Sequence, residues 1–209
     1  MVILKRKTIP NVRAPPGIVI CTQEKGWMDS NLVEDWVQHV LLPFIRPPAG
    51  VARSKTLLVL DSYRGHLTDT VRGLLRWHRI TPAIIPGGCA PLLQPLDVCV
   101  NRSFKAGVRT HYNGWFVDEG IEFLTTAGSL RKPPLELVLR WIAAAWEAVP
   151  EDIIIKSFKT CGISNATDGT EDHLILAHMQ DGAQVEVHDD VHAAGDVEEW
   201  INPLYVTGD

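Results

Sequence analysis

Two aspartates stand out because each is set in an otherwise apolar stretch of the sequence. Asp61 ends the run "LLVLD" and Asp97 lies in "LLQPLDVCV", with 35 residues between the two acids. A carboxylate beside buried strand sequence loses hydration, so it needs a hydrogen-bond donor, an opposite charge or a metal ion. Taken singly, Asp61 could be a turn acceptor and Asp97 a helix-dipole partner. Taken together they could share a Mg²⁺ ion, which accepts one or two protein carboxylates and completes its shell with water and phosphate.

The elements around the two acids support this second interpretation. Leu57–Leu60 is a short, unbroken apolar run, which predicts a central strand covered on both faces. Asp61 would then lie at the C-terminal end of that strand, where ligands gather in open α/β sheets. Pro95 suits the first position of a helix, which places Asp97 in the first helical turn, where a negative charge is favoured.

Strands and helices alternate along the rest of the predicted order. The helix in "NLVEDWVQHVLLPFI" is predicted to begin with a capping box of Asn31 and Glu34, and the next helix with Thr68 as its N-cap. This alternation predicts an α/β domain with a mixed or parallel sheet. The predicted strands are "VILKRK", "GIVICT", Leu57–Leu60 and Ala83–Ile85.

Two later helices are predicted to be amphipathic. The first continues from Pro95 through Phe104 and Tyr112, and the second lies in "PPLELVLRWIAAAWEAV". Large aromatic side chains on the apolar stripe of such helices are usually core residues. We therefore predict that three tryptophans are buried: Trp115, Trp141 and Trp146.

The net charge of -5 hides an uneven distribution. All 20 Lys and Arg residues fall within residues 1–159, whereas residues 160–209 hold 11 acids and no Lys or Arg. A basic body suits a polyanionic partner, and the acidic end could be a solvated tail or an internal competitor for the basic surface. No apolar run approaches the roughly 20 residues that cross a bilayer, so we expect no membrane partner.

Five basic or titratable residues near the two acids are candidates for contact with DNA. Arg102, Lys105 and Arg109 follow Asp97 at helical spacing and could bind phosphates, although a solvated basic helix face is the alternative. Arg64 and His66 follow Asp61 in a predicted loop. The histidine could orient a carboxylate or a phosphate, or be an ordinary surface residue.

Three segments resemble a known family: "LLVLDSYRGH", "IIPGGCAPLLQPLDVCVNRSFK" and "GWMDSNLVEDWV". They look like the DDE transposase domain of the pogo/Tigger group, within the mariner-like superfamily, and the resemblance extends from about Val2 to Asp172. It implies an α/β, RNase H-like fold with a mixed sheet flanked by helices. In that family, carboxylates hold two divalent metals, which activate water or a 3′-hydroxyl to attack a DNA phosphodiester. By this resemblance Asp61 matches the second acid of the triad and Asp97 the third, and both would bind Mg²⁺ or Mn²⁺.

The resemblance also implies a first acid on a first strand, upstream of the segment that "MVILKRKTIP" resembles. We therefore expect a DDE endonuclease-like domain at residues 1–172 without its first strand, inactive as this chain alone, followed by an acidic, flexible tail at residues 173–209. The implied partner is DNA, with chromatin proteins as a further partner, and the implied compartment is the nucleus. The alternative is a domesticated, non-catalytic protein that binds DNA, chromatin or other proteins.

Overall fold

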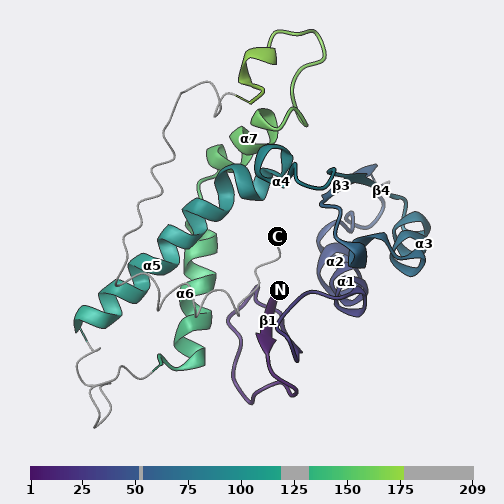
Figure 1. Ribbon diagram of the computed structural model, residues 1–209. Coiled ribbons are helices and arrows are strands. Elements are labelled where there is room, and N and C mark those ends of the chain that lie inside the picture. The colour runs from purple at the N-terminus through teal and green to yellow at the C-terminus, as the bar shows by residue number, and fades with distance from the viewer. Residues whose placement is uncertain (52–53, 119–131, 177–209) are drawn as a thin grey trace. The chain divides into compact units, whose positions relative to one another are not determined.

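The computed structural model describes residues 1–51, 54–118 and 132–176 (Figure 1). These residues divide into two compact units: a first unit of residues 1–9 and 19–97, and a second unit of residues 10–18, 98–118 and 132–176. Strands and helices both contribute, in agreement with the predicted α/β class. The predicted acidic tail lies almost entirely outside the described residues. Among the described helices, none combines the length and the apolar character that crossing a bilayer requires.

The strands of the first unit form two small sheets. β1 (Val2–Lys5) pairs in parallel with β2 (Ile20–Gln23), and β3 (Thr56–Leu60) pairs in parallel with β4 (Ile80–Ile84). The described residues therefore show two separate two-stranded sheets in place of the single mixed sheet that the sequence predicts. Each pair is joined by a long connection instead of a tight hairpin turn, and parallel pairing requires such a crossover.

The first helix, α1 (Ser30–Trp36), begins earlier than the sequence predicts. The N-cap is Asp29, whose Oδ1 accepts a hydrogen bond from the Leu32 N–H at 3.0 Å. The predicted capping box of Asn31 and Glu34 is therefore wrong. Asp29 has the extended backbone of an N-cap residue, and its side chain is the one that reaches a free amide of the first turn. The helix continues through the π-helical segment η1 (Val37–Leu41) and α2 (Leu42–Phe44).

A helical crossover connects β3 to β4. It consists of the 3₁₀ turn η2 (Arg64–Leu67) and α3 (Asp69–Trp77), which lies beside β4 in Figure 1. Thr68 caps α3 as predicted, since its Oγ1 accepts from the Val71 N–H at 3.3 Å. After β4 the chain enters α4 (Ala90–Leu93). The buried core of this unit lies between α1, η1, α3 and β4, and comprises Val33, Val37, Leu41, Val71, Leu75 and Ile80.

The surroundings of β3 differ from those of the predicted central strand. Among the described residues β3 has a strand partner on one edge alone, β4. Leu57 is 55% exposed, and the other four residues are half-buried. The prediction of a strand buried on both faces is therefore wrong for the described structure, because a second neighbour would be needed to complete the covering.

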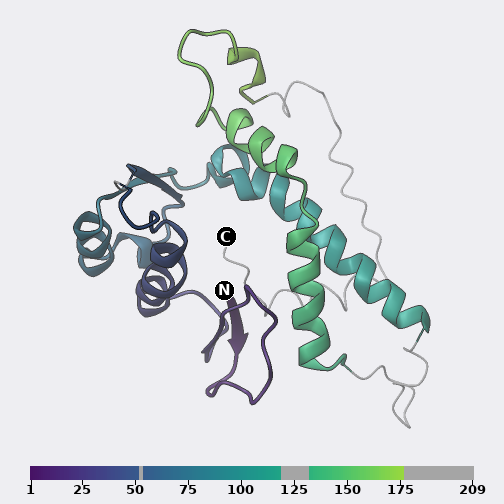
Figure 2. The same cartoon turned by 180° about the vertical axis from the view of Figure 1, so that it is seen from behind.

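The second unit is helical in its described part. The π-helical segment η3 (Leu96–Val100) leads into α5 (Asn101–Asp118), and the later helices are α6 (Leu135–Glu147) and α7 (Glu151–Thr160). Figures 1 and 2 both show α5 and α6 side by side. A short 3₁₀ turn, η5 (Asp172–Leu174), follows α7.

Aromatic side chains hold α5 against α6. Tyr112, Trp115 and Trp141 form a buried cluster, with the rings of the two tryptophans 5.9 Å apart. The predicted burial of Trp115 and Trp141 is confirmed, whereas that of Trp146 is wrong, since it is 45% exposed. Trp146 lies at the edge of the buried face of α6, and its ring packs edge-on against the ring of Phe104. That stripe comprises Leu139, Trp141, Ile142 and Ala145.

Candidate functional site

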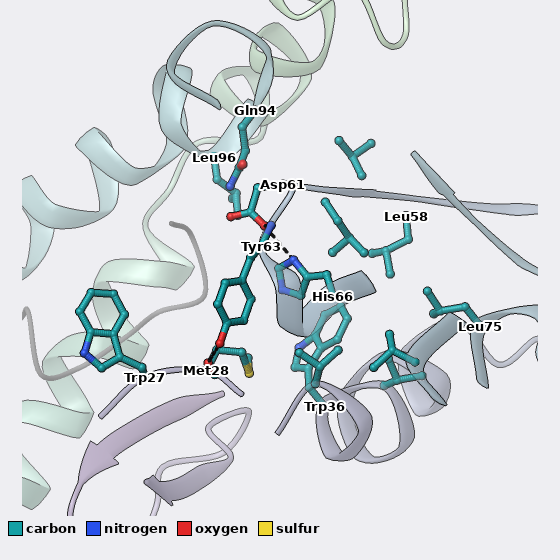
Figure 3. Close-up of a pocket in the computed structure, with 15 residues that line it drawn as sticks. Trp27, Met28, Trp36, Leu58, Asp61, Tyr63, His66, Leu75, Gln94 and Leu96 are labelled. Atoms are coloured by element: carbon teal, nitrogen blue, oxygen red, sulfur yellow. Dashed lines mark hydrogen bonds and ion pairs between the residues drawn. The ribbon is translucent and has the colours of Figure 1, made fainter. Parts of the chain in front are cut away.

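Asp61 follows β3 directly and lines a pocket of about 300 Å³ in the first unit. Apolar side chains from α1, β3 and α3 form most of the wall (Figure 3). Three polar side chains, Asp61, His66 and Gln94, lie close together at one end. The pocket therefore joins an apolar interior to a small polar cluster at the C-terminal end of a parallel strand, the position where α/β sheets gather ligands.

The Asp61 carboxylate is fixed through one of its two oxygens. Oδ1 accepts a hydrogen bond from the Tyr63 N–H at 3.0 Å, which closes a short turn. Nδ1 of His66 lies 2.8 Å from the same oxygen, and both side chains are 16% exposed. This approach is close enough for an ion pair but is not aligned as a hydrogen bond, so the buried Nδ1 has no hydrogen-bond partner within the described residues. In that same part of the chain Oδ2 accepts no hydrogen bond, which leaves it open towards a ligand.

Tyr63 fastens this turn to a distant segment. Its hydroxyl donates to the Met28 carbonyl at 2.7 Å, and its ring stands edge-on to His66 with centroids 5.3 Å apart. Gly65 makes room for that ring, since a Cβ at this position would overlap it. We call residues 61–66 the Asp61 turn. Its shape is set by the hydrogen bonds of Tyr63 to Asp61 and Met28 and by the close contact of Gly65 with the Tyr63 ring.

Gln94 contributes a buried oxygen that lacks a donor. The residue is 9% exposed, and its Oε1 has no hydrogen-bond partner in the described part of the chain. In Figure 3 its side chain extends towards Asp61. An unsatisfied buried amide costs about 1–3 kcal/mol, so a donor or a cation bound here would be stabilised. The sequence signal that could have identified Gln94 is a single polar residue within the apolar run "PLLQPL".

Asp97 occupies the helical turn that follows this cluster. It lies in η3, is half-buried, and its backbone N–H donates to the Gln94 carbonyl at 3.0 Å. The residues that line the pocket include Gln94 and Leu96 but not Asp97. The described geometry therefore brings Asp61, His66 and Gln94 together, with Asp97 next along the chain.

The chemistry of the cluster can be compared with the needs of a divalent cation. Within residues 1–51, 54–118 and 132–176, no three or more His, Cys, Asp and Glu side chains lie close enough to share a metal ion. The open Oδ2 of Asp61 and the unpartnered Oε1 of Gln94 are oxygen donors of the kind that Mg²⁺ prefers. These donors fit a single weakly held ion, and the two-acid site of Asp61 and Asp97 stays a prediction.

The basic candidates are all on the surface of their own units. Arg64 is the first residue of η2 and is exposed. Arg102, Lys105 and Arg109 are exposed along α5, at spacings that place them on one face of that helix. Contact of these residues with DNA stays a prediction. The buried stripe of Phe104, Val108, Tyr112 and Trp115 lies on the adjoining face of α5.

Asp61 at the end of a parallel strand stands where α/β folds place their ligand-binding residues. The chain belongs to the DDE superfamily endonucleases, because the model of that family matches residues 1–158. It is 34% identical over 173 residues, 83% of its length, to a human and to a mouse protein named "Pogo transposable element with KRAB domain". A human "Pogo transposable element with ZNF domain" is 28% identical over 157 residues, 74% of this chain.

These matches confirm the resemblance to the pogo group that the sequence motifs indicate. The chain spans 28% of the length of the two KRAB-containing relatives and 10% of the ZNF-containing one. No solved structure matches the chain. The sequence comparisons therefore establish the family of this chain, and they assign it no activity.

Proposed function

We propose that this chain binds DNA as a transposase-derived DDE endonuclease domain, with the Asp61 turn as the site that meets a backbone phosphate. The observation that carries the proposal is the state of Asp61: one oxygen is fixed and the other is open, beside the unpartnered Gln94 Oε1 of the described structure. Two acceptor oxygens repel a bare phosphate, so a cation between them and the phosphate is the natural bridge.

Asp61 and Asp97 are the residues that would hold Mg²⁺ or Mn²⁺, with Gln94 Oε1 as a neighbouring oxygen. When bound, such an ion neutralises phosphate charge and lowers the pKa of coordinated water. The protein determines which oxygen of Asp61 would face the ion. The Tyr63 N–H and His66 occupy Oδ1, so Oδ2 is the oxygen left for the ion.

The basic residues supply affinity without sequence preference. Arg64 is exposed within the Asp61 turn, and Arg102, Lys105 and Arg109 are exposed along α5. Each phosphate neutralised by such a residue releases counterions, so binding weakens as salt rises. A protein that acts on chromosomal DNA works in the nucleus, and chromatin proteins are the further partners expected there.

Binding without cleavage by this chain alone is the form of the function that we favour. Placing two ions for phosphodiester cleavage normally takes more acids than Asp61 and Asp97. The described residues hold no cluster of three or more metal-binding side chains. A chain that keeps the fold and the DNA surface without cleavage is the domesticated, non-catalytic alternative.

A nicking assay tests the catalytic part. Purified full chain and an Asp61→Asn variant are incubated with supercoiled plasmid in Mg²⁺ and, separately, in Mn²⁺. We expect equal, background nicking from both proteins. Nicking by the unaltered chain that disappears in Asp61→Asn would contradict this expectation and show that the chain cleaves DNA.

A salt titration tests the binding part. Replacement of Arg102, Lys105 and Arg109 together by Ala is expected to reduce the slope of log affinity against log salt by about 1 for each phosphate that is no longer neutralised. A control variant with the same charge change replaces three exposed arginines of the first unit, Arg46, Arg72 and Arg76. An equal effect of the two triple variants would show that α5 is not the contact surface.

A further inference from the structure

The outer face of α3 differs from the inner face that borders the pocket. Val71 and Leu75 are buried on the inner face and line the pocket. On the other side, at about 100° per residue, the exposed residues from position 72 onward cover about 140° of the helix surface. They are Arg72, Gly73, Arg76 and Trp77. We call these four residues, together with Arg79 in the turn that follows, the α3 outer face. None of the five lines the pocket.

Trp77 is 82% exposed, so both faces of its ring are available to a partner. Side chains on a helix lean towards its N-terminus, onto the residue one turn earlier. For Trp77 that residue is Gly73, which has no side chain, and a Cβ built there would meet nothing within 4 Å. Glycine in the interior of a helix is destabilising. The sequence therefore leaves open space beside an exposed indole at a cost to the helix.

The arginines of the α3 outer face lack counter-ions. Arg72 and Arg76 are four residues apart on one helix, a spacing at which like charges repel. Asp69 lies one turn before Arg72, but within the described ranges no ion pair includes Arg72, Arg76 or Arg79. A bound polyanion would relieve this repulsion, so the surface favours a negatively charged partner.

Arg79 has a backbone conformation that favours glycine. Its φ is 55°, in the left-handed region, and its N–H donates to the Arg76 carbonyl at 3.0 Å, which closes the end of α3. Glycine is the usual residue at such a helix end, because a Cβ in this region is strained. In the part of the chain that the structure describes, no ion pair of the Arg79 guanidinium offsets that strain. Departures from local preference of this kind are typical of functional sites.

Arginines around an exposed indole suit single-stranded nucleic acid. Arginine neutralises the phosphates, and an unpaired base stacks on the aromatic ring, since every base has a flat π-face. Duplex DNA supplies the phosphates alone, because its bases are already stacked in pairs. An acidic polypeptide likewise supplies charge alone, because a carboxylate side chain has no flat apolar face to cover the indole.

We propose that the α3 outer face binds single-stranded nucleic acid, with an unpaired base stacked on Trp77 and the neighbouring phosphates held by Arg72, Arg76 and Arg79. This site is separate from the Asp61 turn and from the basic residues of α5, so each can fail without the other. The probe of the salt titration above is duplex DNA, which offers Trp77 no free base. Arg72 and Arg76 therefore serve in that titration as a charge control.

The stacking is tested by the anisotropy of fluorescently labelled oligothymidine mixed with the full chain. Trp77→Ala is expected to weaken binding by about tenfold or more. The thermal midpoint should stay unchanged, because the ring is 82% exposed. Affinity for the same strand annealed to oligoadenosine should also stay unchanged in this variant. The matched control is Phe44→Ala, which removes an 87% exposed ring of the same unit and should leave both affinities intact.

Arg79→Gly separates binding from structure, because its two expected effects have opposite signs. The thermal midpoint should rise as the left-handed backbone is relieved of its Cβ, whereas the affinity for oligothymidine should fall and its salt slope decrease by about 1. A residue that merely shapes the end of the helix would raise the midpoint and leave the affinity alone.

Three results would overturn the proposal. The first is an unchanged affinity for oligothymidine in Trp77→Ala, and the second is an equal loss of affinity for the annealed duplex in that variant. The third is polyglutamate that displaces oligothymidine and whose own affinity falls equally in Trp77→Ala, since this assigns the α3 outer face to an acidic polypeptide.

Discussion

The two units differ in how completely their described residues fill the interior. In the second unit Tyr112, Trp115 and Trp141 pack against one another between α5 and α6. In the first unit the wall of β3 borders a pocket of about 300 Å³, with the buried Gln94 Oε1 unpartnered at its end. Close-packed interiors resist change, whereas an open apolar space beside polar groups is suited to a ligand. The comparison indicates that the helical pair of the second unit serves stability, whereas the first unit combines a buried core with an open space that can take a ligand.

The largest expected effect tests the packed aromatic cluster of the second unit. Trp141→Ala removes a buried indole and leaves a cavity between α5 and α6, so the free energy of unfolding should fall by about 3–5 kcal/mol. Urea denaturation followed by circular dichroism measures it. The control is Trp146→Ala on the same helix, where the side chain is 45% exposed. Decreases of equal size in the two variants would contradict the assignment of the packed cluster.

A smaller effect is expected in the Asp61 turn. Gly65→Ala places a Cβ into the Tyr63 ring, which must then move away from Met28, at a cost of about 1–3 kcal/mol. The control is Gly73→Ala in α3, where a Cβ meets nothing within 4 Å. That change should stabilise the protein by about 0.5–1 kcal/mol, because alanine favours a helix interior. Thermal unfolding should show a lower midpoint temperature for Gly65→Ala and a higher one for Gly73→Ala. A higher midpoint in both variants would show that the Tyr63 ring does not fill the space beside Gly65.

The smallest expected effect concerns the Lys159–Glu171 ion pair of the second unit. Lys159 donates to Glu171, and the Ala166 N–H donates to Glu171 Oε2 at 2.9 Å. The Lys159 hydrogen bond first, and the Ala166 bond second, hold the pKa of this carboxyl below its ordinary value. A lowered pKa in the folded state gives stability that is complete above the unfolded pKa and is lost as pH falls through the folded one.

Amide exchange at Ala166, followed from neutral to acidic pH, checks this dependence. Protection should decrease as the solution is acidified, and the decrease should be weaker in Glu171→Gln, which cannot titrate. A profile that is identical in the two proteins would remove Glu171 as the source of the pH dependence.

Local sequence rules located most of the helices and strands, but β4 (Ile80–Ile84) begins three residues before the predicted Ala83–Ile85. Thr68 caps α3 as predicted, and the aromatic stripe of α5 and α6 is buried except at Trp146. The errors arose where the local pattern leaves two choices open. Both Asp29 and Asn31 can cap a helix, and the N-cap is the one whose side chain reaches a free amide. An apolar run such as β3 predicts a covered strand, but the number of its neighbours is decided by the rest of the fold.

The candidate site was partly predictable for the same reason. Asp61 follows its strand directly, so its position at the strand end is a local property. The contacts that orient it are not local: Tyr63 reaches Met28 across 35 positions of sequence, and Gln94 arrives from beyond β4. Those partners come from the path of the chain, which residue periodicity does not record.

The π-helical segment η1 holds one residue more than an α-helical turn would hold. Each α-helical residue advances about 100° around the axis, so a deletion in an ordinary α-helix rotates everything after it by about that angle. Deletion of one residue from residues 38–40 would instead return η1 to α-helix, because the extra residue is lost, and Val33 and Leu41 would keep their places in the core. The same deletion in α3 has no extra residue to remove, so it would turn Leu75 away from the face that Val71 shares with it. The helical segment that includes Val37 can therefore lose a residue without turning the side chains that line the pocket.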